Sequence, residues 1–355
     1  MYPPFNGAMP PSQNFYYGDP EYFEKQQEKR QISRRGSGIG LAIVGMQVLP
    51  YVLSTIAAAV LAAVGLMDPL AINNGYSGMQ PLTYYIYYAI LYLLMVTVPF
   101  LVLMPCFHLR FGQVMPFKKT ARPGLLVLAG VGGLAMCMAS NYLATQYSVV
   151  MQGIGIPTDM SSLPNDGSLV SQICYFIIIA ILPAFAEEFA FRGVMLQLLR
   201  PYGEAFAVIG SAFAFGVMHG TVIQIPFAFA GGLFFGYIAV RTGSIWPSVL
   251  LHFLNNGLSY FQELIQNNSG NFIYEQTSTV LIYALFLITT LAGLICLAVL
   301  LHKDKNFFRT NPDTMHKLNE KEKFGKLVGN PGMIIALVII SISMLVQMLV
   351  PGLVS

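Results

Sequence analysis

Two adjacent carboxylates and one guanidinium interrupt an otherwise apolar run, ILPAFAEEFAFRGVML. Glu188 and Arg192 are four residues apart, so on a helix they share one face and are expected to form a structural ion pair. Glu187 lies roughly 100° around such a helix from Glu188. It does not easily share the same partner, which leaves its carboxylate available for chemistry.

More polar side chains follow in the apolar stretches of the next 65 or so residues, and they are His219, His252, Asn255 and Asn256. The motif RPYGEA predicts a turn, and Glu187 and His219 lie about 23 Å from it on either side, so antiparallel helices bring them level. His252 and Asn256 share one helix face. A carboxylate, two imidazoles and a carboxamide at one depth can activate water and stabilise an oxyanion.

The elements that position these residues are predicted from composition. Apolar residues make up 55% of the 355 residues and charged residues 10%, and the mean hydropathy is +0.62. These values exclude an ordinary soluble domain and indicate a polytopic membrane protein, in which each span needs roughly 20 apolar residues. We predict an all-α transmembrane bundle of about nine spans, with its catalytic core in residues 169–260. The predicted spans are 39–66, 83–107, 123–146, 169–186, 205–222, 224–240, 245–260, 277–301 and 332–353.

Lysine and arginine predict the orientation, because they are retained in cytoplasmic loops. They cluster before the first span, between the second and third spans, and between the last two spans. The loops at 67–82, 147–168 and 261–276 contain none. The N-terminus is therefore expected in the cytoplasm and, with an odd number of spans, the C-terminus outside. We expect a bacterial plasma membrane.

Four regions are predicted along the chain. They are a disordered cytoplasmic tail (1–38), N-terminal transmembrane helices (39–168), the core (169–260), and C-terminal transmembrane helices with a charged cytoplasmic loop at 302–331 (261–355). The tail is rich in Pro, Gln, Tyr and charge, which is typical of segments without a packed core. The four cysteines lack the close spacing of a metal or redox motif and are expected to be packing residues.

Three motifs of the core resemble those of the CPBP intramembrane proteases, the group that includes the type II CAAX prenyl endopeptidases and bacterial Abi proteins. EEFAFRG (187–193), FGVMH (215–219) and SIWPSVLLHFLNN (244–256) are similar to the patterns EExxxR, FxxxH and HxxxN or HxxxD. All three patterns occur in order and on separate predicted helices. The resemblance covers about a quarter of the chain, and three spaced motifs are more specific than any one.

The resemblance implies a membrane-embedded peptidase that hydrolyses a peptide bond near the cytoplasmic face. It implies that Glu187 is the general base, with His219 helping to hold the water, and that His252 and Asn256 bind the oxyanion. The supporting residues that it implies are Glu188, Arg192 and Phe215, the last packed beside His219. It also implies a polar intramembrane cavity that opens toward the cytoplasm.

Zinc is a second way to activate the water. Two histidines and a glutamate are a common ligand set of catalytic zinc sites, which makes His219 and His252 candidate zinc ligands. The sequence lacks an HExxH pair that would fix two imidazoles on one helix face. We favour a carboxylate–histidine mechanism and leave a Zn²⁺ cofactor open.

Other functions are consistent with the same residues. A non-catalytic immunity or scaffold protein would use the fold to bind a partner, and a proton-coupled transporter would use a Glu and two His as a relay. No obvious internal repeat favours the transporter. For a peptidase, the expected partners are a peptide or protein substrate, lipidated or not, and membrane lipids. The net charge of +3 does not indicate nucleic acid binding.

Overall fold

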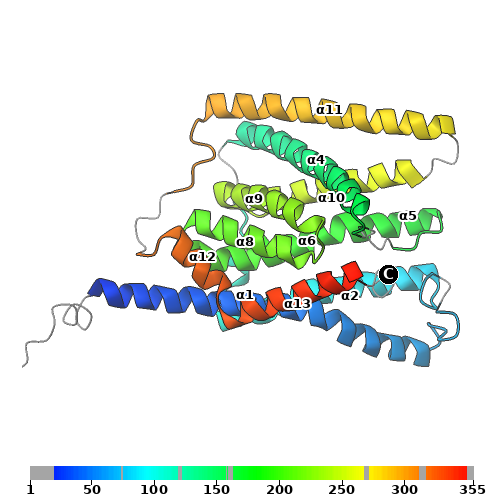
Figure 1. The fold of residues 1–355 in the computed structure, drawn as a ribbon, viewed down its shortest axis with the longest axis horizontal. Coiled ribbons are helices and arrows are strands. Elements are labelled where there is room, and N and C mark those ends of the chain that lie inside the picture. The colour runs from blue at the N-terminus through cyan, green and yellow to red at the C-terminus, as the bar shows by residue number, and fades with distance from the viewer. Residues whose placement is uncertain are drawn as a thin grey trace, which may run out of the picture.

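The computed structural model describes residues 20–349 except 73–74, 119–121, 157, 159–162, 268–271 and 312–316. All its named elements are helices, which run mostly along the long axis of the molecule (Figure 1). The predicted all-α bundle is confirmed. One isolated bridge joins Met67 and Met79 in a connection between helices.

Helices α1 (Pro20–Ala63), α2 (Pro81–Cys106) and α13 (Pro331–Leu349) form one side of the bundle (Figure 1). α1 and α13 cross at glycines, where a Cβ at Gly40 would lie 2.2 Å from the backbone of Met333. The expected disordered tail is only partly described. Residues 20–38 are the first part of α1 and are helical, and residues 1–19 lie outside the described residues. Ile32 is buried, so this part of the helix gains contacts that composition does not reveal.

The chain from Leu169 to Tyr202 is one continuous helical run that contains three segments without α-helical pitch. It comprises α5 (Leu169–Phe176), the π-helix η1 (Ile177–Ile181), α6 (Leu182–Glu188), the π-helix η2 (Phe189–Met195), α7 (Leu196–Leu199) and the 3₁₀ turn η3 (Arg200–Tyr202). The turn predicted at RPYGEA is confirmed at η3. The span predicted at 169–186 is longer in the structure, because the buried Arg192 does not end the helix.

Three helices complete the core, namely α8 (Glu204–Met218), α9 (Gln224–Thr242) and α10 (Trp246–Asn267). α8 and α9 pack closely because Gly232 has no side chain. A Cβ there would lie 3.1 Å from Cα of Ala212. Gly232, in the segment AGGLFFG, therefore serves close helix packing. Gly243, in the left-handed conformation that favours glycine, ends α9 and turns the chain into α10.

Helices α4 (Pro123–Gly153) and α11 (Phe272–Lys303) pack on each other at the other side of the bundle (Figure 1). Two short helices lie in the connections, α3 (Phe111–Val114) and α12 (Glu320–Val328). α12 falls in the predicted charged loop at 302–331 and packs against α1. Its Lys323 is buried and donates to the backbone oxygen of Tyr202.

The prediction of about nine spans is not confirmed. In the described part of the chain, seven helical runs are long and apolar enough to cross a membrane. The two other predicted spans correspond to α8, which has only 15 residues, and to α10, which is not among the seven. α10 carries polar residues along its length, which lower its mean hydropathy; they include His252, Asn255, Asn256, Gln262 and Glu263.

Candidate active site

A proline shapes the helix that carries the two glutamates. Pro183 has no backbone N–H and its ring clashes with the carbonyl of the residue four positions earlier, which is Ile179. The helix widens to the π-helix η1 at this point. The freed carbonyl of Ile179 accepts a hydrogen bond of 3.0 Å from Nδ2 of Asn256 on α10. The proline therefore creates the acceptor that ties the two helices together.

Arg192 and Glu188 form the ion pair expected from their spacing. Nη1 of Arg192 lies 2.9 Å from Oε1 of Glu188, and both side chains are fully buried. Nη2 donates to the backbone oxygen of Gly232 at 3.2 Å, and the guanidinium lies over the ring of Phe215 at 4.3 Å. These contacts stabilise a charge that the apolar surroundings would otherwise exclude.

His252 joins this pair from α10. Its Nδ1 lies 2.9 Å from Oε1 of Glu188, and its ring stacks on Phe235 at 5.4 Å with an interplanar angle of 22°. When Glu188 is ionised it can only accept, so the proton of the imidazole is assigned to Nδ1. The opposite nitrogen, Nε2, then points away from the ion pair and is available to another group.

That other group is Glu187. Its Oε2 lies 3.7 Å from Nε2 of His252, and its Oε1 accepts a hydrogen bond from the hydroxyl of Tyr92 on α2. The Glu187 side chain is 6% exposed, so it is enclosed but reachable. Tyr92 lies outside the three motifs and is not among the predicted site residues. Its only sequence signal is its place in a run of tyrosines at helical spacing.

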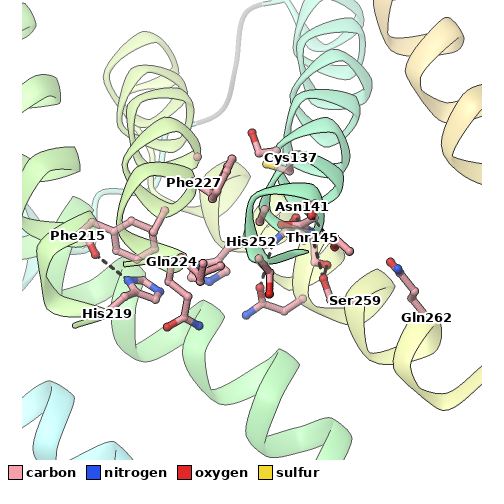
Figure 2. A pocket seen from close by; sticks show the side chains of 18 of the residues that line it. Cys137, Asn141, Thr145, Phe215, His219, Gln224, Phe227, His252, Ser259 and Gln262 are labelled. Atoms are coloured by element: carbon pink, nitrogen blue, oxygen red, sulfur yellow. Dashed lines mark hydrogen bonds between the residues drawn. The ribbon is translucent and has the colours of Figure 1, made fainter. Parts of the chain in front are cut away.

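His219 is the residue that caps the C-terminal end of α8. Its Nδ1 is 2.8 Å from the backbone oxygen of Phe215, and the two rings meet edge to face at 5.0 Å (Figure 2). The predicted packing of Phe215 beside His219 is confirmed. Phe215 also contacts His252, at 5.8 Å between centroids, so it packs against both imidazoles. No direct hydrogen bond joins His219 to Glu187 in the described structure.

A cavity of about 500 Å³ lies in front of these residues, between α4, α8, α9 and α10 (Figure 2). His219, His252 and Asn256 line it. Glu187 and Glu188 do not, because they lie behind His252. Of the four predicted catalytic residues, three thus line one wall of the cavity, and the carboxylate of Glu187 lies behind His252.

Amides and hydroxyls continue the wall along α10 and α4. Asn141 Nδ2 donates to Oδ1 of Asn255 and to Oγ of Ser259, both at 3.2 Å. Asn255 in turn donates to Oδ1 of Asn256 at 3.1 Å. Asn255 therefore belongs to a network that fixes Asn256, and Asn141 on α4 is a second residue that the motifs do not reveal.

The residues do not fit a zinc site as they are arranged. In the described part of the chain, no group of three or more His, Cys, Asp or Glu side chains could hold a metal ion. His219 and His252, the candidate ligands, each use Nδ1 for a protein contact and keep Nε2 free, as zinc-bound histidines do, so what is missing among the described residues is a third ligand beside them. A Zn²⁺ cofactor, left open from the sequence, stays open, and no step below is derived through a metal.

The segment that carries the site is also the one that matches a known protein family. Residues 169–258 match the model of the family described as type II CAAX prenyl endopeptidase Rce1-like. The match is to the same group of peptidases that the three motifs resemble. The expected resemblance to CPBP proteases is thereby confirmed for the core, which is about a quarter of the chain.

A Bacillus subtilis protein named "Putative membrane peptidase YdiL" is 25% identical over 206 residues. The aligned region is 55% of this chain and 81% of the relative. No solved structure matches the chain. Together, the Rce1-like segment and the seven apolar helical runs indicate an integral membrane protein with a peptidase core.

Proposed function

We propose that this protein is an intramembrane endopeptidase in which Glu187 activates a water molecule for attack on a peptide bond. The observation that supports it best is the linked set of Arg192, Glu188, His252 and Glu187 beside a polar cavity, within the Rce1-like segment. Buried charge inside a membrane bundle is costly, and a function explains its presence.

The general base in this proposal is Glu187. Tyr92 occupies Oε1, so Oε2 is the oxygen that takes the proton from water. His219, with Nδ1 held by the carbonyl of Phe215, presents Nε2 to the cavity and orients the water. The water oxygen attacks the carbonyl carbon, and Glu187 later delivers the proton to the leaving amine nitrogen. Atoms and charge balance without another reactant.

The oxyanion is stabilised by His252 and Asn256. When both ring nitrogens of His252 carry a proton, Nδ1–H donates to Glu188 and Nε2–H can donate to the oxyanion. Asn256 uses one N–H of its amide on Ile179, and the second N–H is available to the cavity. Glu188 and Arg192 do not touch substrate in this account. They hold His252 in place.

The proposed mechanism also predicts the depth in the membrane at which the peptide bond is cleaved. His252 lies six residues after the start of α10, or about 9 Å along the helix. The Lys and Arg residues near that end of the bundle support a cytoplasmic location for it and for the N-terminus. The scissile bond would then lie in the cytoplasmic half of the membrane, which we take to be a bacterial plasma membrane.

The first test is hydrolysis of a fluorogenic peptide library, prenylated and unprenylated, by the purified full-length protein. Wild type should cleave, His219→Asn should cleave at least about 100-fold more slowly, and a zinc chelator should have no effect. Loss of cleavage with the chelator and recovery with Zn²⁺ would replace the carboxylate–histidine mechanism with a metal-dependent one. Equal cleavage by wild type and His219→Asn would contradict the assigned role of His219.

A further inference from the structure

The polar lining of the cavity extends along two helices, α4 and α10. On α4 the lining includes Asn141, Thr145 and Ser148, and on α10 it includes Ser259 and Glu263. Each set repeats every three to four residues, so each forms a stripe along one helix face. From His252 to Glu263 the stripe on α10 extends about 16 Å. It runs away from the start of α10 at Trp246.

This direction leads to the end of the bundle that lacks positive charge. The connections at 64–80, 154–168 and 268–271 contain no Lys or Arg. Lys and Arg instead flank the opposite helix ends, in the first half of α1, before α4, in η3, at the end of α9 and after α11. α9 begins near the middle of the long axis, whereas α4, α10 and α11 continue beyond that point (Figure 1). The cavity lies beside the start of α9, where Gln224 and Phe227 line it.

We propose that the substrate enters this groove from the non-cytoplasmic side, as an extended polar peptide segment with a positive charge. The proposal rests on the proposed peptidase function. It differs from the cytoplasmic opening that the family resemblance implies. In this account the bond lies deep, near the cytoplasmic half of the membrane, and the chain that carries it reaches it from the other side.

The chemistry of the lining selects a peptide. Hydroxyls and amides on both facing helices can pair with backbone N–H and C=O groups, which every residue of an extended chain presents. An isoprenyl chain would leave these groups without partners, and that costs free energy. The groove therefore fits the hydrated segment of an exported or membrane-anchored protein better than a lipid chain.

Glu263 supplies the preference for positive charge. It is the one carboxylate in the lining, and its two oxygens accept from the hydroxyl of Tyr175 at 2.9 and 3.1 Å. Among the described residues no Lys, Arg or His forms an ion pair with it. A lysine, arginine or free amino terminus of the substrate could pair with this carboxylate.

The test is the reaction of single cysteines with charged, membrane-impermeant thiosulfonates in intact cells. The four native cysteines are replaced by serine, and Thr145→Cys and Ser259→Cys are introduced separately, one on each stripe. Both should react without permeabilisation. Lys305→Cys, after α11, should react only after permeabilisation, and Leu287→Cys, on the exposed apolar face of α11, should stay unreactive. Reaction of Thr145→Cys and Ser259→Cys only after permeabilisation would overturn the proposal.

The charge preference is measured in the same cells. Ser259 and Glu263 are four residues apart on one helix, about 6 Å between Cβ atoms, so the carboxylate should favour the cationic reagent over the anionic one by at least about threefold. The ratio is normalised to that of a small thiol in solution. Glu263→Gln should return it to one, and an unchanged ratio would overturn the charge preference. Labelling needs no catalysis, so a reactive groove in a protein that cleaves nothing would refute the peptidase alone.

Discussion

At the residue scale, the site is a series of side-chain contacts that leads from Arg192 through Glu188 and His252 to Glu187. Its first pair follows directly from the sequence, because residues four apart on a helix must meet. The contact of Phe215 with His219 follows from the same rule. Tyr92 could not be predicted, since it comes from a helix 95 residues earlier and the run around it contains several equivalent tyrosines.

Tyr92 should act on the chemistry through Glu187. Tyr92→Phe removes the hydroxyl that holds Oε1, and we expect a loss in kcat of at least roughly tenfold, since a hydrogen bond to a charged group is worth about 1.5 kcal/mol or more. KM should change little. Tyr88→Phe, one helical turn away on α2, is the matched control and should retain activity. A wild-type kcat for Tyr92→Phe, measured with any peptide that the protein cleaves, would show that Oε1 needs no such contact.

Arg192 should be essential for the fold rather than for chemistry. Arg192→Met leaves the carboxylate of Glu188 buried without its cation, and the expected loss of stability is about 3–5 kcal/mol. The double variant Arg192→Met with Glu188→Leu should recover much of it, because no buried charge remains. Thermal unfolding in detergent measures both proteins. Equal unfolding temperatures for the single and double variants would show that the pair is not coupled.

At the scale of elements, the sequence predicts the helices around the motifs and the turns between them. It does not predict their ends, and α8 ends at Met218 instead of near residue 222 because Gly220, directly after the cap residue His219, takes the left-handed conformation that stops a helix. The π-helix η1 had a signal in Pro183, inside a predicted span. The sequence does not show what Pro183 does, because the carbonyl that it frees accepts a hydrogen bond from Asn256 on another helix.

Removing this proline tests the element directly. Pro183→Ala restores a backbone N–H, so the carbonyl of Ile179 can return to regular helical bonding and release Asn256. Activity should fall roughly tenfold, the equivalent of one hydrogen bond, while the unfolding temperature stays equal or rises. Pro50→Ala, in the middle of α1, is the control and should retain activity. Full activity of Pro183→Ala would mean that η1 does not position Asn256.

At the scale of the molecule, composition predicts a membrane bundle, and the number of spans is where that reasoning fails. Hydropathy counts apolar stretches, but α8 is short and α10 carries the polar groups that the function needs. The tail shows a similar limit, since residues 20–38 gain helical structure from burial against the rest of the chain. The side from which the cavity is reached could not be predicted from motifs, because it depends on how far each helix extends.

The distribution of Lys and Arg along the whole chain predicts the orientation of the protein in the membrane. We expect an epitope tag at the N-terminus to be protected in intact cells and detected after permeabilisation, because Lys25, Lys29, Arg30, Arg34 and Arg35 keep this end in the cytoplasm. Antibody binding or proteolysis of the tag in intact cells measures this. Detection of the tag without permeabilisation would reverse the orientation of the bundle and with it the side of the groove.

The central claim is that Glu187 is the base of a hydrolytic reaction. The most direct measurement is kcat/KM for one cleaved peptide with Glu187→Gln, beside Glu320→Gln as a surface control and with unfolding temperatures for both. Glutamine keeps the size and hydrogen bonding of the side chain but cannot take a proton from water. The account predicts a loss of at least about 100-fold for Glu187→Gln, no loss for Glu320→Gln, and folded protein in each case. Cleavage by folded Glu187→Gln at the wild-type rate would contradict it.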